Sequence, residues 1–318
     1  MKILLAGGAG YIGSKLAPQL LERGYEADVV DLFWFGDFLP ENVGKMKKDI
    51  FEIKKEDITK YDQIIFLAGL SNDPMAEFSP SLNFIHNASA PAYLGYIAKQ
   101  AGVKKFIYAS SCSVYGYTEN ELYDEKSPAV SNYPYGISKL QGEQAVLQMA
   151  NQHFSVLCLR QGTVSGYSPR MRLDLIVNTM FKSAMLDHAI TVNNPAIWRP
   201  VLSIDDAVTA YIRAIESSET IQGVFNIASG NYTVGEVADL VKASIKSKLD
   251  EDIALKIEHR QDYRNYKVSI EKARNLLSFK PRYDIDGIVQ DLIVHYDRFK
   301  DLRNKQYYNI EVFRSMKT

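Results

Sequence analysis

The sequence predicts an α/β protein with a doubly wound parallel sheet and a smaller C-terminal α+β substrate-binding region. Short apolar runs alternate with helical patterns through the first half of the 318 residues, and this alternation stops after about residue 165. A glycine-rich turn also follows the first apolar run directly. We therefore expect one domain over 1–165 and a second region over 166–318. This boundary is approximate, because the sequence leaves open whether the chain crosses back to the first domain near 199–229.

Each apolar run of the first half is typical of a strand that is buried on both faces of a parallel sheet. The expected strands are 2–7, 27–32, 63–69, 104–111 and 155–160. The expected helices between them are 14–24, 87–102 and 135–152, with Gly24 and Gly102 where two of them should end. In the second half we expect helices at 173–185, 205–217, 234–248 and 285–300, and a short strand at 223–229.

The composition excludes several classes of protein. The formal net charge is −1, so nothing indicates a nucleic-acid partner or an anionic membrane surface. No apolar run is long enough to span a membrane, and the run at the N-terminus stops at glycines. The five histidines are scattered, and Cys112 and Cys158 stand in different segments. We therefore expect no metal site, no disulfide scaffold, and a cytoplasmic location.

The first expected strand leads into GGAGYIG, which spaces Gly7, Gly10 and Gly13 at intervals of three before a helix. Gly7 permits the tight turn, Gly10 lets a pyrophosphate approach the backbone, and Gly13 allows close packing of the helix. The second strand ends at Asp31, 18 positions after Gly13, near the offset of about 20 expected for an acid that holds the ribose hydroxyls. That acid repels a 2′-phosphate, so we expect NAD. A phosphate-free turn with a capping Asp is the alternative.

Further contacts to the dinucleotide are expected along the same edge of the sheet, where the strands end. These are Tyr11 and Ile12 in the turn, Asp49 and Ile50 after the third strand-like stretch, Leu67, Ala68 and Gly69 after the next strand, and Asn87 in the following helix.

Three more stretches accompany the glycine turn: YASSCSVYG (108–116), YPYGISKLQGE (133–143) and LRQGTVSGYSPR (159–170). With them the chain resembles the extended short-chain dehydrogenase/reductase family, specifically its NAD-dependent nucleotide-sugar epimerases and dehydratases of the UDP-glucose 4-epimerase type. WRPVLSIDDA (198–207) and FNIASG (225–230) extend the resemblance over nearly the whole chain. The resemblance implies a Rossmann domain, NAD as cofactor and a nucleotide-diphosphate sugar as substrate.

Tyr135 and Lys139 stand four residues apart, so they share a helix face. The resemblance implies that Tyr135 is the catalytic acid/base, that Lys139 is its partner and a cofactor contact, and that Ser111 holds the substrate hydroxyl. A free tyrosine has a pKa near 10, which is too high for a good base at neutral pH. We expect the ammonium and the positive nicotinamide to lower it. The alternative is an ordinary surface pair.

The resemblance also implies contacts to the sugar nucleotide from Asn178, Arg199 and Arg264. Two arginines suit a pyrophosphate, because the planar guanidinium makes charge-assisted hydrogen bonds; a surface ion pair is the alternative for each. Thr163 stands where many epimerases carry Asn against the nucleotide, and we expect it beside the substrate.

The chain departs from the dehydratases at two positions that follow Ser111. Cys112 and Ser113 stand where those enzymes carry acids, so elimination of water is disfavoured, and both are expected beside the substrate. Cys112 is either a reactive thiol or a packed small residue. The stretch SNDP (71–74) is either a substrate-facing loop or an Asn-Asp-Pro turn.

The resulting hypothesis is NAD-dependent epimerisation of a nucleotide sugar, at C4, through a transient ketone. The alternatives are a 4-keto reductase or dehydrogenase and a catalytically silent dinucleotide sensor, although a sensor has no need of a positioned base. The helices from Asn87 and from Tyr135 carry apolar residues on more than one face. Relatives commonly pair these helices into a four-helix bundle, so we expect a homodimer.

Overall fold

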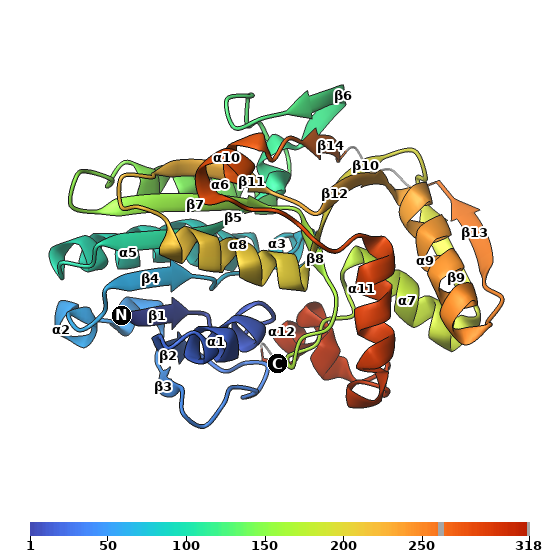
Figure 1. The fold of residues 1–318 in the computed structure, drawn as a ribbon, viewed down its shortest axis with the longest axis horizontal. Coiled ribbons are helices and arrows are strands. Elements are labelled where there is room, and N and C mark those ends of the chain that lie inside the picture. Colours follow the sequence, from blue (N-terminus) through green and yellow to red (C-terminus); the bar gives the residue numbers. More distant parts are fainter. Residues whose placement is uncertain (260–263, 317–318) are drawn as a thin grey trace.

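Seven parallel strands form the main sheet of the computed structural model, which describes residues 1–259 and 264–316 (Figure 1). The strands are β1 Lys2–Ala6, β2 Glu26–Asp31, β3 Gly44–Lys47, β4 Gln63–Phe66, β5 Lys105–Ser111, β7 Ser155–Gln161 and β11 Gly223–Ile227. Their order is β11-β7-β5-β4-β1-β2-β3, and every neighbouring pair is parallel. The chain winds outward in both directions from β1 and β4, so the predicted doubly wound Rossmann sheet is confirmed.

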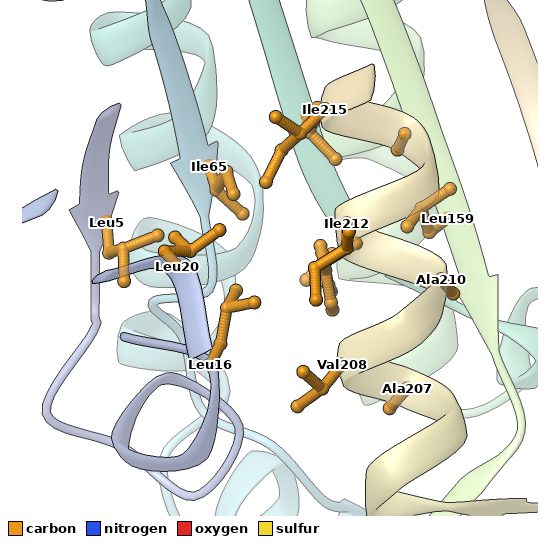
Figure 2. Packing of buried hydrophobic residues seen from close by; sticks show 14 of the residues in the cluster. Leu5, Leu16, Leu20, Ile65, Leu159, Ala207, Val208, Ala210, Ile212 and Ile215 are labelled. Carbon is orange, nitrogen blue, oxygen red and sulfur yellow. The ribbon is translucent and has the colours of Figure 1, made fainter. Parts of the chain in front are cut away.

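Helices cover both faces of this sheet. One face carries α1 Gly13–Glu22, α8 Ile204–Glu216 and α10 Glu271–Leu277, and the other carries α2 Lys55–Ile58, α5 Ala90–Gln100 and α6 Pro134–Leu147. Successive strand residues therefore point into two different cores, as Leu4 and Leu5 of β1 do. Figure 2 shows Ile212 and Ile215 of α8 pointing across the first core toward Leu20 of α1. Burial on both faces explains why each strand appears in the sequence as a continuous apolar run.

The smaller region lies at the carboxyl ends of the sheet strands (Figure 1). Its strands are β8 Thr163–Ser165, β10 Trp198–Ser203 and β12 Gly230–Thr233 in one sheet, β9 Ala189–Asn193 paired with β13 Ala254–Glu258, and β6 Tyr117–Tyr123 paired with β14 Asn265–Val268. Three helices, α7 Ile176–Asp187, α9 Val234–Leu249 and α11 Ile285–Val294, enclose a second core with these strands. This is the expected α+β region. Because β11 and α8 belong to the layers of the main sheet, the division at residue 165 stays a prediction.

Short elements complete the chain. They are α3 Asp73–Phe78, α4 Pro80–Phe84, a π-helix Ile85–Ser89, α12 Asn309–Ser315, and 3₁₀ turns at Ile50–Glu52, Cys112–Tyr115, Tyr296–Arg298 and Lys305–Tyr307. Two of the predicted helices are too long. The one expected to reach residue 152 ends at Leu147, because Asn151 pairs with Phe154 and turns the chain into β7. The one expected to reach residue 300 ends at Val294, where the Tyr296 ring turns onto Phe181.

Both cysteines are free and buried. Within residues 1–259 and 264–316, no helix is long and apolar enough to cross a membrane. Over the same ranges, His, Cys, Asp and Glu side chains form no group of three or more that would suit a metal ion.

Candidate active site

A cavity of about 560 Å³ opens at the carboxyl ends of the central strands, a size typical of ligand sites. It is lined by residues at or just after the ends of β1, β4, β5 and β7, including Gly10, Leu67, Ser111 and Gly162. The direction of winding reverses between β1 and β4, which is where open α/β sheets bind their ligands.

The glycine turn forms one wall of this cavity. Gly7 has a φ of +79°, and a Cβ on it would lie 2.4 Å from the Ala68 nitrogen, so only glycine fits there. A Cβ on Gly13 would lie 2.3 Å from the Gly8 carbonyl oxygen, which explains how α1 packs so closely on the turn. Gly10 lines the cavity, and the nearest atom to a Cβ there would be the Gly7 oxygen at 3.2 Å. The turn therefore leaves backbone open at the N-terminus of α1, as a bound pyrophosphate requires.

Asp31 lines the same cavity at the end of β2. Its carboxylate accepts hydrogen bonds from the backbone nitrogens of Ala9 at 3.0 Å and Phe33 at 2.8 Å. Burial raises the pKa of this carboxyl, and these backbone hydrogen bonds oppose the rise. Each carboxylate oxygen accepts more than one hydrogen bond, so ribose hydroxyls still find acceptors here.

The other predicted dinucleotide contacts divide into two groups. Those that line the cavity are Tyr11, Ile12, Asp49, Ile50, Leu67, Ala68 and Gly69. Asn87 lies behind the wall: its Nδ2 donates to the Leu70 carbonyl oxygen at 2.9 Å and to Ser138 Oγ at 3.1 Å. Its Oδ1 is buried, and a Cβ on Gly69 would lie 2.2 Å from it. Asn87 therefore shapes the loop after β4, and Gly13 likewise supports the turn from outside the cavity.

Ser111, Tyr135 and Lys139 all line the cavity. Ser111 ends β5, and its Oγ accepts from the Ser113 nitrogen at 3.1 Å as the cap of a 3₁₀ turn. Tyr135 is the second residue of α6, after a proline at the first helical position, where the missing N–H costs nothing. Lys139 follows one turn later on the same helix. The end of β5 and the first turns of α6 thus place all three side chains in the same cavity.

The electrostatics of this trio differ from the expectation. Burial raises the pKa of the Tyr135 phenol, against a hydrogen bond from Ser111 that lowers it. Burial also lowers the pKa of Lys139 to about 7. The Lys139 Nζ donates to the Ala109 carbonyl oxygen at 2.9 Å. Arg172, rather than Lys139, is the cation that favours the tyrosinate here. Bound NAD would supply the positive nicotinamide as a further cation.

Two predicted substrate contacts lie outside the cavity. Cys112 is 1% exposed, and its Sγ donates to the Arg160 carbonyl oxygen at 3.1 Å. Burial raises the pKa of this thiol, so it is a packed small residue. Asn178 is fully buried: its Oδ1 accepts from the Gly166 nitrogen at 2.9 Å and its Nδ2 donates to the Arg172 oxygen at 2.7 Å. The structure does not support a substrate contact for either residue.

The remaining predicted substrate residues, Ser113, Thr163, Arg199 and Arg264, line the cavity. Arg199 comes from β10, and its Nη1 donates to the Arg264 carbonyl oxygen. Arg264 makes an ion pair with Asp73. The sequence left open whether the stretch 71–74 is a substrate-facing loop or a turn, and it combines features of both. Its residues line the cavity, and Asn72 Oδ1 caps α3 by accepting from the Met75 nitrogen at 3.1 Å.

Several cavity residues were not predicted from the sequence. Among them are Trp34, Phe35, Gln161, Arg170, Arg172, Tyr266, Asn309 and Ile310. Arg172 is 5% exposed and holds Asp174 through two hydrogen bonds of 2.9 and 3.0 Å. The run PRMR at 169–172 was a signal for both arginines, because it begins four residues after β8 ends at Ser165. Asn309 and Ile310 carry no such signal, since only tertiary contact brings them here.

Comparisons with known proteins agree with this geometry. A family model described as the NAD dependent epimerase/dehydratase family matches residues 3–228. UDP-glucuronic acid decarboxylase 6 of Arabidopsis thaliana is 28% identical over 299 residues, which cover 89% of this chain and 84% of the relative. A UDP-glucose 4-epimerase of Corynebacterium glutamicum is 24% identical, with 92% of this chain and 94% of the relative covered.

The solved structure of MoeE5 in complex with UDP-glucuronic acid and NAD superposes with a TM-score of 0.83. The match covers 94% of this chain and 99% of that structure, at 22% sequence identity. At this identity the likeness establishes the shared fold.

Proposed function

The chain belongs to the NAD dependent epimerase/dehydratase family, and from this premise we propose that it epimerises a nucleotide-activated sugar at C4 through a transient ketone. NAD is its cofactor. The observation that carries the proposal is the convergence of Ser111, Tyr135 and Lys139 on the cavity that the glycine turn lines. A hydroxyl, a phenol and an amine at one wall are the groups that proton transfer at a sugar carbinol requires.

The proton steps fall to the side chains of the chain itself. Tyr135 takes the proton from the C4 hydroxyl, and Ser111 Oγ hydrogen-bonds the same sugar oxygen and orients it. Lys139, which lines the same cavity, would hold the ribose of the cofactor. When bound, NAD would supply the hydride acceptor and donor for the oxidation and reduction at C4, held by the glycine turn and by Asp31. Tyr135 then gives its proton back to the sugar oxygen, so no net proton leaves the site.

Elimination of water is disfavoured because the two positions after Ser111 carry no carboxylate. Cys112 is buried against Arg160, and Ser113 is the only one of the two in the cavity. The cavity also contains Asp73 and Asp174, but each is ion-paired, with Arg264 and Arg172 respectively. The pKa of Asp174 lies below its ordinary range, because the charge and hydrogen bonds of Arg172 outweigh the effect of its burial, so Asp174 is a poor proton donor. We therefore expect the ketone to be reduced back to an alcohol by return of the hydride.

The substrate class is a nucleoside-diphosphate sugar. Arg199 lines the cavity from β10 and Arg264 from the residue before β14, and their charge suits the pyrophosphate. Among the relatives, the Corynebacterium glutamicum protein is named a UDP-glucose 4-epimerase, and the MoeE5 structure holds UDP-glucuronic acid. A uridine nucleotide is the first candidate for this chain.

The test is to incubate the protein with UDP-, GDP-, CDP- and dTDP-sugars and to follow the products by NMR. An epimerase interconverts two C4 epimers, and absorbance at the NADH band shows no net change during turnover. Stoichiometric NADH or a free ketosugar would identify a dehydrogenase instead. A pentose formed from UDP-glucuronic acid would identify a decarboxylase, the activity for which the Arabidopsis relative is named.

We also propose that the protein is a cytoplasmic homodimer that pairs α5 and α6 across a two-fold axis. Large apolar side chains on and beside these helices are exposed, with Tyr96 at 54%, Phe84 at 48% and Ile137 at 40%. A four-helix bundle would bury them. The cytoplasmic location is consistent with two free, buried cysteines.

A further inference from the structure

Arg170 lines the cavity beside the glycine turn, although the sequence did not single it out. Its backbone nitrogen donates to Ser14 Oγ at 3.3 Å, and Ser14 is the second residue of α1. Two residues earlier, Ser168 Oγ donates to the Tyr11 carbonyl oxygen at 2.6 Å. The segment 168–170 therefore lies directly on the glycine turn, and Arg170 extends from it into the cavity wall.

The guanidinium of Arg170 is buried and makes no ion pair with a described carboxylate, although the charges of Asp174 and Asp31 act on it from farther away. Only 2% of the residue is exposed, and its Nε has no hydrogen-bond acceptor among the described residues. No described carboxylate lies within ion-pair distance of it, whereas Arg172 holds Asp174. Its Cζ lies 3.8 Å from the centre of the Phe35 ring, which stacks on one face of the guanidinium. Burying a guanidinium that has no ion-pair partner costs free energy of folding, and a bound anion would offset this cost.

The segment that holds Arg170 in place comes from the far end of the chain. Asn309 Oδ1 accepts from Arg170 Nη2, and Asn309 Nδ2 donates to Ser71 Oγ at 2.9 Å. Asn309 is 4% exposed and begins α12. Four residues later, Phe313 is 2% exposed and packs with Leu70 and Met75. Helix α12 is thereby fastened to the loop after β4 by both polar and apolar contacts, at the rim of the cavity.

We propose that Arg170 anchors the pyrophosphate of the dinucleotide, and that Asn309 of α12 is the residue that positions it. The inference rests on NAD as the cofactor and not on which sugar the protein converts. The glycine turn offers backbone donors and the α1 N-terminus to one side of the pyrophosphate, and Arg170 supplies the full positive charge. Phe35 and Asn309 fix the plane of the guanidinium before the ligand arrives, which reduces the cost of ordering it.

Two other anions are possible partners for such an arginine, a 2′-phosphate and the substrate pyrophosphate. Asp31 occupies the same end of the cavity, and its carboxylate repels a 2′-phosphate. The substrate pyrophosphate has Arg199 and Arg264, which enter from the smaller region. The contacts of segment 168–170 with Tyr11 and Ser14 place Arg170 with the cofactor turn.

The test measures binding rather than turnover. Nucleotide-free protein is titrated calorimetrically with NAD, ADP-ribose, adenosine, NADP and UDP. Arg170→Gln removes the charge but keeps much of the size, so NAD and ADP-ribose should bind roughly 10- to 100-fold more weakly, the range expected for one charge-assisted contact. Adenosine, which lacks phosphate, should bind unchanged. Arg170→Lys should recover part of the loss.

Asn309→Ala should weaken NAD roughly three- to tenfold, as expected for a positioning residue that contributes one hydrogen bond. Arg213→Gln, an exposed arginine of α8, is the matched control and should bind NAD like the wild type. NAD should also protect α12 of the wild type, and not of Arg170→Gln, from trypsin at Arg314. Thermal unfolding checks that each variant folds, and if Arg170→Gln does not, Arg170→Lys and Asn309→Ala decide the question.

Three results would overturn the proposal. NAD affinity within twofold of wild type in Arg170→Gln, or in both other variants, would remove Arg170 from the cofactor site. A loss confined to NADP would assign Arg170 to a 2′-phosphate. A loss confined to UDP would assign it to the substrate. Because no sugar is present in these titrations, none of these outcomes depends on the proposed epimerase activity.

Discussion

Replacing the buried lysine of the active site should make the protein more stable while it abolishes turnover. Lys139 is 4% exposed, and burial lowers its pKa from the ordinary 10.5 to about 7. The unfolded chain therefore binds a proton on this lysine more tightly than the folded chain does. Folding with the lysine charged is penalised, and Lys139→Met removes that penalty because methionine has similar length and no charge.

The size of the effect follows from the pKa difference. A shift from 10.5 to about 7 corresponds to a penalty of about 5 kcal/mol. It applies in full below about pH 7, where both states are charged, and it disappears as the pH approaches 10.5, where both are neutral. The hydrogen bond from Nζ to the Ala109 oxygen is lost in the variant and offsets about 1 kcal/mol. We expect Lys139→Met to be about 3–4 kcal/mol more stable at pH 6.

The assay is urea unfolding of nucleotide-free protein, followed by circular dichroism at one-unit steps from pH 6 to pH 10. The stability difference between variant and wild type should shrink steadily across this range. Lys47→Met, at an exposed position of β3, is the control and should show no such trend. A variant that is less stable than wild type at pH 6, or a difference that does not change with pH, would refute the reasoning.

Two other predictions concern the base and the assembly. Tyr135→Phe should keep the fold and bound NAD, since the ring remains, but turnover should fall by roughly a hundredfold or more. Steady-state rates and the NAD content of the purified protein check this, and near-normal turnover would remove Tyr135 from the mechanism. Light scattering at micromolar concentration should give the wild type twice the 35.9 kDa chain mass, whereas Tyr96→Arg should shift it toward the monomer. A monomeric wild type would contradict the dimer.

Much of the fold was predictable because its signals are local. A strand buried on both faces is mostly apolar, so β1, β4, β5 and β7 stand out as apolar runs, with buried polar residues such as Lys105 and Arg160 near their ends. Gly7 was identifiable for a similar reason, since a φ of +79° beside Ala68 excludes any side chain. Helix ends were predicted less well. Leu147 ends α6 because of a turn at Asn151, which follows no periodic pattern.

The residues of the candidate site also divide into those that local sequence indicated and those that only the tertiary structure brought there. Ser111, Tyr135 and Lys139 were predicted from the family resemblance of their motifs, and all three line the cavity because strand ends and helix starts meet at one edge of a parallel sheet. The direction of a side chain depends on what packs around it, and only the tertiary structure decided that Cys112 turns onto Arg160 while Ser113 faces the cavity. Asn309 is the extreme case. It reaches Arg170 across 139 positions of sequence, and no local periodicity or spacing records a contact that exists only after the chain has folded back on itself.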